Sequence, residues 1–146
     1  MKQFMVLMAV LPLMIVFFTQ FSLDQMNESK IAIVNECVYA AKEEAKQEGG
    51  FTAQIQSSLK QKIAGALGIS ENEITITTNA DRSGAVKRLT SAAAISAADW
   101  KDKLIYYKVS VPIGNMMAGA GLLGIRESEN KYVYTVDAYT ASEWLD

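Results

Sequence analysis

Hydrophobic residues are concentrated at the start of the chain, where residues 4–23 form a run of twenty positions without a charge. At a rise of about 1.5 Å per residue, a helix of this length spans roughly the 30 Å hydrocarbon core of a bilayer. The residues that follow, TQFSLDQ at 19–25, lack the small-x-small site of a cleaved signal peptide. We therefore expect residues 1–24 to form a retained transmembrane stem. Its expected apolar residues are Phe4, Met5, Leu7, Met8, Val10, Leu11, Pro12, Leu13, Met14, Ile15, Val16, Phe17, Phe18 and Phe21.

Charges at the two ends of the stem predict its orientation. Lys2 precedes the apolar run, whereas Asp24 and Glu28 follow it. The positive-inside rule then predicts a cytoplasmic N-terminus, with the rest of the chain on the other side of the membrane. Pro12 lies in the middle of the run and is tolerated in a membrane helix, where neighbouring groups satisfy the freed carbonyl. It gives either a plain kink or a point where the helix unwinds on leaving the bilayer.

The helix is expected to continue beyond the membrane. Residues 25–48 contain no glycine or proline, and Gly49-Gly50 then provides a stop signal. Apolar residues at spacings of three and four form one narrow helical face. The sequence therefore predicts a single helix of about 70 Å over residues 2–48, whose amphipathic half, 25–48, packs on a downstream head. The residues of this packing face are Ile31, Val34, Val38, Ala41 and Ala45.

Residues 49–146 are expected to form an extracytoplasmic α+β head. Apolar residues at every fourth position from Phe51 to Leu67 predict a second helix that ends at Gly68. Alternating patterns predict strands at EITIT (73–77), LIYYKVSVPI (104–113) and KYVYTVDAYT (131–140). Residues 79–103 have weak periodicity and are expected to be irregular, with a short helix near 97–103. The predicted fold is α+β: a long helix packed on a small antiparallel sheet of about three or four strands, with a second short helix.

The connection between the last two strands, residues 114–125, is apolar and rich in glycine. It contains no lysine and therefore differs from a Walker phosphate loop. One interpretation is a loop folded back on the core. The other is a flexible apolar contact surface for a neighbouring subunit or the membrane. The candidate contact residues are Met116, Met117, Leu122 and Leu123.

Composition argues against catalysis and nucleic-acid binding. The 146 residues carry a net charge of −2, and they include no histidine and one cysteine. No basic excess points to a nucleic-acid partner, and the commonest general base and metal ligand is missing. Asp99, Asp102, Glu127 and Glu129 are scattered and are interpreted as solvated surface charges. We expect no enzyme, catalytic residue, cofactor or metal. Cys37 either bridges two subunits or packs as a small hydrophobic residue.

The order of these parts resembles that of type IV pilin-like proteins, and more closely that of the TadE-like pilins and pseudopilins of tight-adherence systems. The matching stretch is LPLMIVFFTQFSLDQMNESKIAIVNECVYAAKEEA, residues 11–45, with its Leu-Pro run and the small pair Ala40-Ala41. The chain departs from the pilin pattern at Met5, where pilins carry a glutamate, and no leader precedes Met1. Whether Met1 is an initiator or a processed N-terminus stays open.

The resemblance implies a structural subunit of an extracellular type IV pilus-like filament used in adhesion or secretion. Before assembly the subunit would reside in the cytoplasmic membrane with its N-terminus in the cytoplasm. It would then join a helical homopolymer with stems in the core and heads on the surface. A cytoplasmic assembly ATPase and a membrane platform are implied as partners. The alternatives are a minor pseudopilin of an assembly or secretion machine and a monomeric membrane-anchored binding domain. A tethered domain more often follows a flexible linker rich in Gly, Ser or Pro, and no such linker lies between Leu23 and Glu48.

Overall fold

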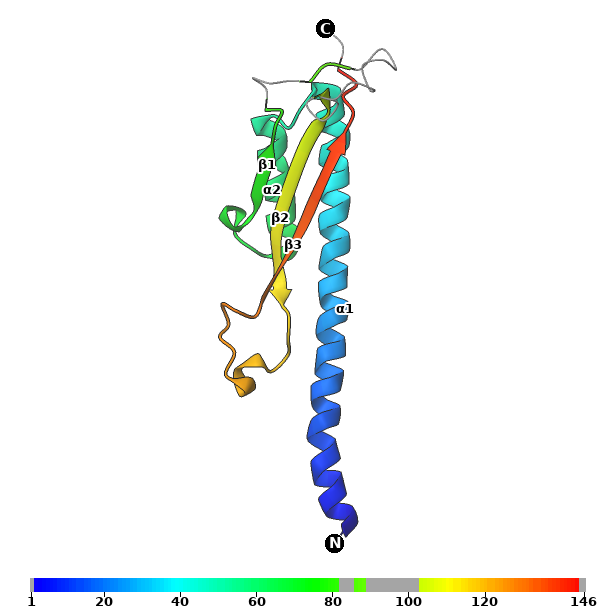
Figure 1. Cartoon of the computed structure of the whole chain (residues 1–146), viewed down its shortest axis with the longest axis vertical. Coiled ribbons are helices and arrows are strands. Elements are labelled where there is room, and N and C mark those ends of the chain that lie inside the picture. Colours follow the sequence, from blue (N-terminus) through cyan, green and yellow to red (C-terminus); the bar gives the residue numbers. More distant parts are fainter. Residues whose placement is uncertain (1, 82–85, 89–102, 145–146) are drawn as a thin grey trace.

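The computed structural model describes residues 2–81, 86–88 and 103–144. Helix α1 (Lys2–Glu48) is 47 residues long and continuous through Pro12, as the sequence predicted. Figure 1 shows that α2 and the strands lie along one half of α1, while its N-terminal half projects away from them. The long helix, the second helix and a three-stranded antiparallel sheet confirm the predicted α+β fold.

Two glycines end α1 where the sequence predicted a stop. Gly49 has φ +78°, in the left-handed region that favours glycine. A side chain on Gly50 would overlap the carbonyl oxygen of Ala80. The last turn of a helix leaves carbonyls without partners, and the head supplies some: Glu143 N–H donates to the Lys46 carbonyl, and Val86 N–H to that of Gly49, both at 2.8 Å.

Helix α2 (Ala53–Leu67) packs against the core through Ile55, Leu59 and Ile63, which recur at every fourth position. It begins two residues later than the apolar spacing suggested, because the Thr52 hydroxyl accepts a hydrogen bond from Ile55 N–H and caps the helix. Phe51 precedes the cap and is fully buried, with its ring centroid 5.1 Å from that of Tyr107.

The sheet has the strand order β1-β2-β3, and both pairs are antiparallel. The strands are β1 (Thr75–Thr78), β2 (Ile105–Asn115) and β3 (Lys131–Thr140). The first begins two residues later than predicted. Glu73 belongs instead to a short 3₁₀ helix, η1 (Glu71–Glu73), because its carboxylate accepts from Ser70 N–H at 3.1 Å and closes a capping box.

One face of the sheet meets the helices and encloses the core. In β2 the alternating residues Ile105, Tyr107, Val109, Val111 and Ile113 are all buried. The alternating residues of β3 are partly buried and pack on the same core: Tyr132, Tyr134, Val136 and Ala138. Ile74 is buried just before β1, and Ile76 packs against the core from within it.

The packing face of α1 lies in this core. Val34, Val38, Ala41 and Ala45 are buried, and Ile31 is partly buried against them. The irregular stretch expected between the first two strands is described only at 79–81, 86–88 and 103, so the helix expected near 97–103 lies outside the described residues apart from Lys103.

A β-bulge interrupts the regular pairing near the end of β2. The pairing with β3 shifts register between Pro112 and Gly114, which leaves Ile113 as the extra residue. A proline within a central strand is usually confined to such a bulge, because it cannot donate to the ladder. The carbonyl of Ile113, the extra residue of the bulge, accepts a hydrogen bond from Lys30 Nζ at 2.8 Å.

Candidate functional site

The N-terminal half of α1 is uncovered. Residues 3–19 are all exposed, and the described part of the chain contains one helix, α1, that is long and apolar enough to cross a membrane. Exposed fractions of about half or more on every side of a helix mean that the stem needs another apolar surface around it. The exposed stem residues are Phe4, Met5, Leu7, Met8, Val10, Leu11, Pro12, Leu13, Met14, Ile15, Val16, Phe17, Phe18 and Phe21.

Polar groups near the end of the apolar run have partners within the chain. The Thr19 hydroxyl donates to the Ile15 carbonyl at 2.7 Å, one turn back along α1. Gln20 Nε2 donates to Asp24 Oδ1 at 2.9 Å. Local bonds of this kind lower the cost of a polar side chain in an apolar environment, so neither residue interrupts the use of the stem as an apolar element.

The β2–β3 loop lies beside the end of the stem. Figure 1 shows it projecting from the sheet toward the N-terminal end of α1. It contains a short 3₁₀ helix, η4 (Ala120–Leu123), in which Ala120 is buried. The four candidate contact side chains face outward instead of covering the core: Met116 is 55 %, Met117 40 %, Leu122 87 % and Leu123 70 % exposed.

Three polar side chains of α1 hold the loop. Gln20 Oε1 accepts from Ala118 N–H at 2.9 Å, and Gln20 Nε2 donates to the Met116 carbonyl at 3.2 Å. Asn27 Nδ2 donates to the Asn115 carbonyl at 3.0 Å. Together with the bond from Lys30 to Ile113, these contacts fix the end of β2 and the start of the loop against α1. We call Gln20, Asn27 and Lys30 the polar clamp.

Asn27 and Gly114 approach each other closely within the clamp. Asn27 is 7 % exposed, and its Oδ1 has no hydrogen-bond partner among the described residues. A Cβ on Gly114 would lie 3.0 Å from that oxygen. Glycine at this position therefore lets the end of β2 lie directly against α1.

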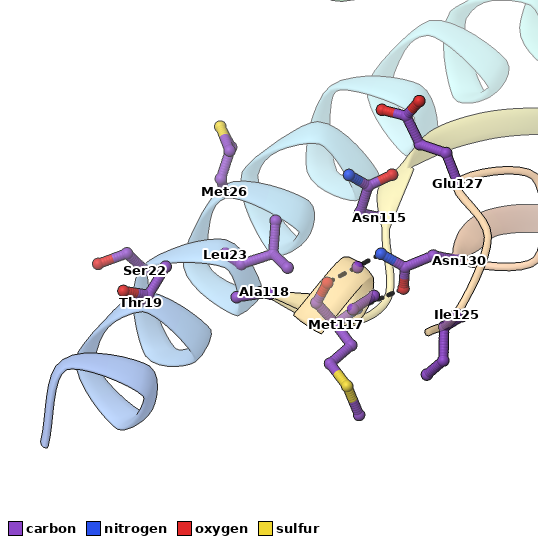
Figure 2. Close-up of a pocket in the computed structure, with 13 residues that line it drawn as sticks. Thr19, Ser22, Leu23, Met26, Asn115, Met117, Ala118, Ile125, Glu127 and Asn130 are labelled. Carbon is purple, nitrogen blue, oxygen red and sulfur yellow. Dashed lines mark hydrogen bonds between the residues drawn. The ribbon is translucent and has the colours of Figure 1, made fainter. Parts of the chain in front are cut away.

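Asn130 closes the loop from the β3 side. Its amide donates to the Met117 carbonyl and accepts from Met117 N–H, both at 2.8 Å, and its own carbonyl accepts from Met116 N–H. The side chain is 6 % exposed. Figure 2 shows the paired amide contacts beside the α1 residues Thr19, Ser22 and Leu23.

A pocket of about 750 Å³ opens between α1 and the loop. Its α1 wall consists of Thr19, Ser22, Leu23 and Met26, and the loop supplies the opposite wall. Apolar and small side chains predominate, with Glu127 and Asn130 at one side. The pocket therefore has room for an apolar group, and its lining side chains do not form an arrangement typical of catalysis.

Acidic residues do not gather into a site where they are described. No group of three His, Cys, Asp or Glu side chains is arranged to hold a metal ion among the described residues. Glu127 and Glu129 are exposed, and Asp99 and Asp102 lie outside the described residues.

Cys37 lies on the head half of α1, where it is partly buried against the core. Burial, followed by the negative charge of Glu36, raises the pKa of its thiol, whereas Lys62 acts in the opposite direction. A raised pKa leaves less thiolate at neutral pH and lowers reactivity.

Sequence reasoning missed the polar clamp, although a signal for part of it exists. The three-and-four spacing of the packing face extends backward from Ile31 to Asn27, Leu23 and Gln20. Polar residues on the face that points at the head indicate side chains with backbone partners there. Lys30 lies beside this face and carried no such signal.

Comparison with known proteins found no matching family model, no matching curated protein and no matching solved structure.

Proposed function

We propose that this chain is a structural subunit of an extracellular type IV pilus-like filament of the tight-adherence kind. The observation that carries the proposal is the continuity of α1, which runs from an uncovered apolar stem into the core of the head without a linker. A monomer in water would leave the whole stem exposed, and either lipid or other stems can cover it.

Exchange between those two coverings costs little. Lipid tails and neighbouring stems are about equally apolar, so leaving the bilayer is nearly balanced if every stem finds partners. The stem is rich in methionine and phenylalanine, including Met5, Met8, Phe17 and Phe18. Flexible thioethers and large rings can adapt to a helical array of neighbours. Before assembly the stem would span the cytoplasmic membrane with its N-terminus inside.

Rigid attachment makes the stem array determine the position of the heads. Val34 and Val38 are buried in the head core, and the polar clamp adds contacts down to Gln20. Heads held this firmly would repeat with the symmetry of the stems. A heterologous interface of this type propagates into an open helix. The assembly ATPase and membrane platform are proposed by family analogy alone.

The proposal is tested by shearing cells that make the chain, sedimenting the supernatant and analysing the pellet by mass spectrometry and electron microscopy. We expect thin fibres in which this chain is abundant, and its intact mass also defines the N-terminus. Recovery only in the membrane fraction would contradict a major filament subunit.

Matched variants test the role of the stem. Leu11→Asp puts a carboxylate at its centre, where an aspartate costs about 2.5–3.5 kcal/mol in membrane insertion. We expect it to abolish fibres, whereas Gln61→Asp on the exposed face of α2 should leave them unchanged. Normal fibres from Leu11→Asp would contradict a buried stem core.

A membrane-anchored binding domain is the second candidate, because the pocket of about 750 Å³ between α1 and the loop has room for an apolar group. A minor pseudopilin would share the same anchored location. Both predict the chain in the membrane fraction and its absence from sheared fibres.

A further inference from the structure

We propose that the tip of the β2–β3 loop, residues 117–125, inserts into the bilayer interface on the head side of the membrane and forms a second membrane contact beside the stem. The inference rests on the proposed membrane location of α1 before assembly. It assigns the lipid bilayer as the partner of the outward-facing side chains of η4.

The polar clamp fixes the depth of the loop. Gln20 bonds to the backbone of Met116 and Ala118 at 3.2 and 2.9 Å. It lies three positions before residue 23, the last of the uncharged run, which corresponds to about 4.5 Å along a helix. A bilayer that covers the apolar run therefore reaches the level of the loop.

The composition of the loop suits that depth. Residues 116–125, MMAGAGLLGI, carry no charge, and Arg126 and Glu127 follow immediately. Leu122 and Leu123 are adjacent and are 87 % and 70 % exposed. Neighbouring leucines exposed in this way are unfavourable in water and favour binding at the acyl boundary of a membrane. The charged residues that follow would then lie at the level of the head groups.

Backbone hydrogen bonds in the loop are made within the chain. Leu122 N–H donates to the Gly119 carbonyl, Gly124 N–H to that of Gly121 and Ile125 N–H to that of Ala120, at 2.9–3.2 Å. At the base of the loop, the Asn130 amide bonds both backbone groups of Met117. Irregular backbone enters an apolar environment only when such groups are satisfied, and these bonds meet that condition for much of the loop.

Lipid is favoured over a second copy because the loop and the stem form a continuous surface. Leu23 and Met26 of α1 share a pocket with Met117 and Ile125. Any lipid that covers the last turns of the stem on this side meets the loop directly. Acyl chains or a head group would fill the pocket without a fixed complementary shape.

Depth-dependent fluorescence quenching tests the inference on the full chain. In a Cys37→Ser background, three single-cysteine variants are made: Leu13→Cys, Gln61→Cys and Leu122→Cys. Each cysteine is labelled with an environment-sensitive probe, and the labelled chain is reconstituted into phosphatidylcholine vesicles. The vesicles carry nitroxide lipids labelled either at the head group or deep in the acyl chain. Leu122 and Gln61 are exposed, so both substitutions leave the core intact.

We expect the probe at position 122 to shift its emission to the blue and to lose more intensity with the shallow nitroxide than with the deep one. The probe at 13 should respond most to the deep nitroxide, and the probe at 61 to neither. A labelled Met117→Cys should lose its quenching when Leu122→Asp and Leu123→Asp are added.

Three other results would overturn the inference in distinguishable ways. Quenching at 13 without quenching at 122 would leave the membrane stem intact and remove the loop contact. A blue shift at 122 that grows with protein-to-lipid ratio, without lipid quenching, would assign the loop to a second copy. No quenching at 13 would overturn the membrane location of the stem itself, and the loop contact with it.

Discussion

The junction between α1 and the head makes a sharp prediction about Gly50. This residue is buried, and Phe51 N–H, next along the chain, donates to the Ala80 carbonyl at 2.8 Å. In Gly50→Ala the new methyl group would overlap the Ala80 oxygen and lie 3.0 Å from the carbonyl carbon and from Cβ of Ala80. The two backbone segments must separate, and the hydrogen bond is then lost.

The cost follows from that bond and its burial. A backbone hydrogen bond contributes about 1 kcal/mol net, whereas a buried donor or acceptor left unpaired costs about 1–3 kcal/mol for each group. Phe51 and Ala80 are both fully buried, so water cannot replace the partner. We therefore expect Gly50→Ala to lower the free energy of unfolding by about 2–4 kcal/mol.

Gly65→Ala provides a matched control. Gly65 is an exposed residue inside α2, and a Cβ there would meet nothing within 4 Å. The same substitution should stabilise the helix by about 0.5–1 kcal/mol. Urea unfolding of the full chain in detergent micelles, followed by far-ultraviolet circular dichroism and tryptophan fluorescence, measures both effects. A Gly50→Ala value within about 0.5 kcal/mol of the unsubstituted chain would refute the close-approach argument.

Three further predictions concern single side chains. Because burial raises the pKa of Cys37, its thiol should react with iodoacetamide more slowly than a cysteine at Tyr39, which is 60 % exposed, in a Cys37→Ser background; equal rates would contradict this. Burial also raises the pKa of the Tyr107 phenol from 10.0, so the unfolded chain loses this proton first as pH rises, and stability falls above pH 10.0. Tyr107→Phe should flatten that fall in urea midpoints measured across alkaline pH, and an unchanged slope would oppose it. Lys30→Met removes the donor to the Ile113 carbonyl and should lower the unfolding free energy by about 1.5–3 kcal/mol in the same urea experiment. An unchanged unfolding free energy would contradict this prediction and would mean that water replaces the ammonium group.

Local pattern was enough to predict the helices α1 and α2 and the strands β1, β2 and β3. An uncharged run followed by residues without a helix breaker gives one helix over 2–48, because helical periodicity and the Gly49-Gly50 stop are encoded within a few neighbouring positions. Alternation likewise gave the buried residues of β2, from Ile105 to Ile113. The observed starts of α2 and β1 lie later than predicted because side chains of Thr52 and Glu73 cap the backbone there.

Tertiary structure alone decided where the β2–β3 loop lies. Its composition allowed either a cover for the core or an outward surface, and no local pattern distinguishes these. The choice depends on the bulge at Pro112 and on partners far away in sequence: Gln20 and Ala118 are 98 positions apart, and Asn27 and Asn115 are 88 apart. Such bonds form only after α1 and the sheet have packed together. The sequence by itself thus determined an apolar stem and an α+β head, whereas packing brought the loop to the level of the stem.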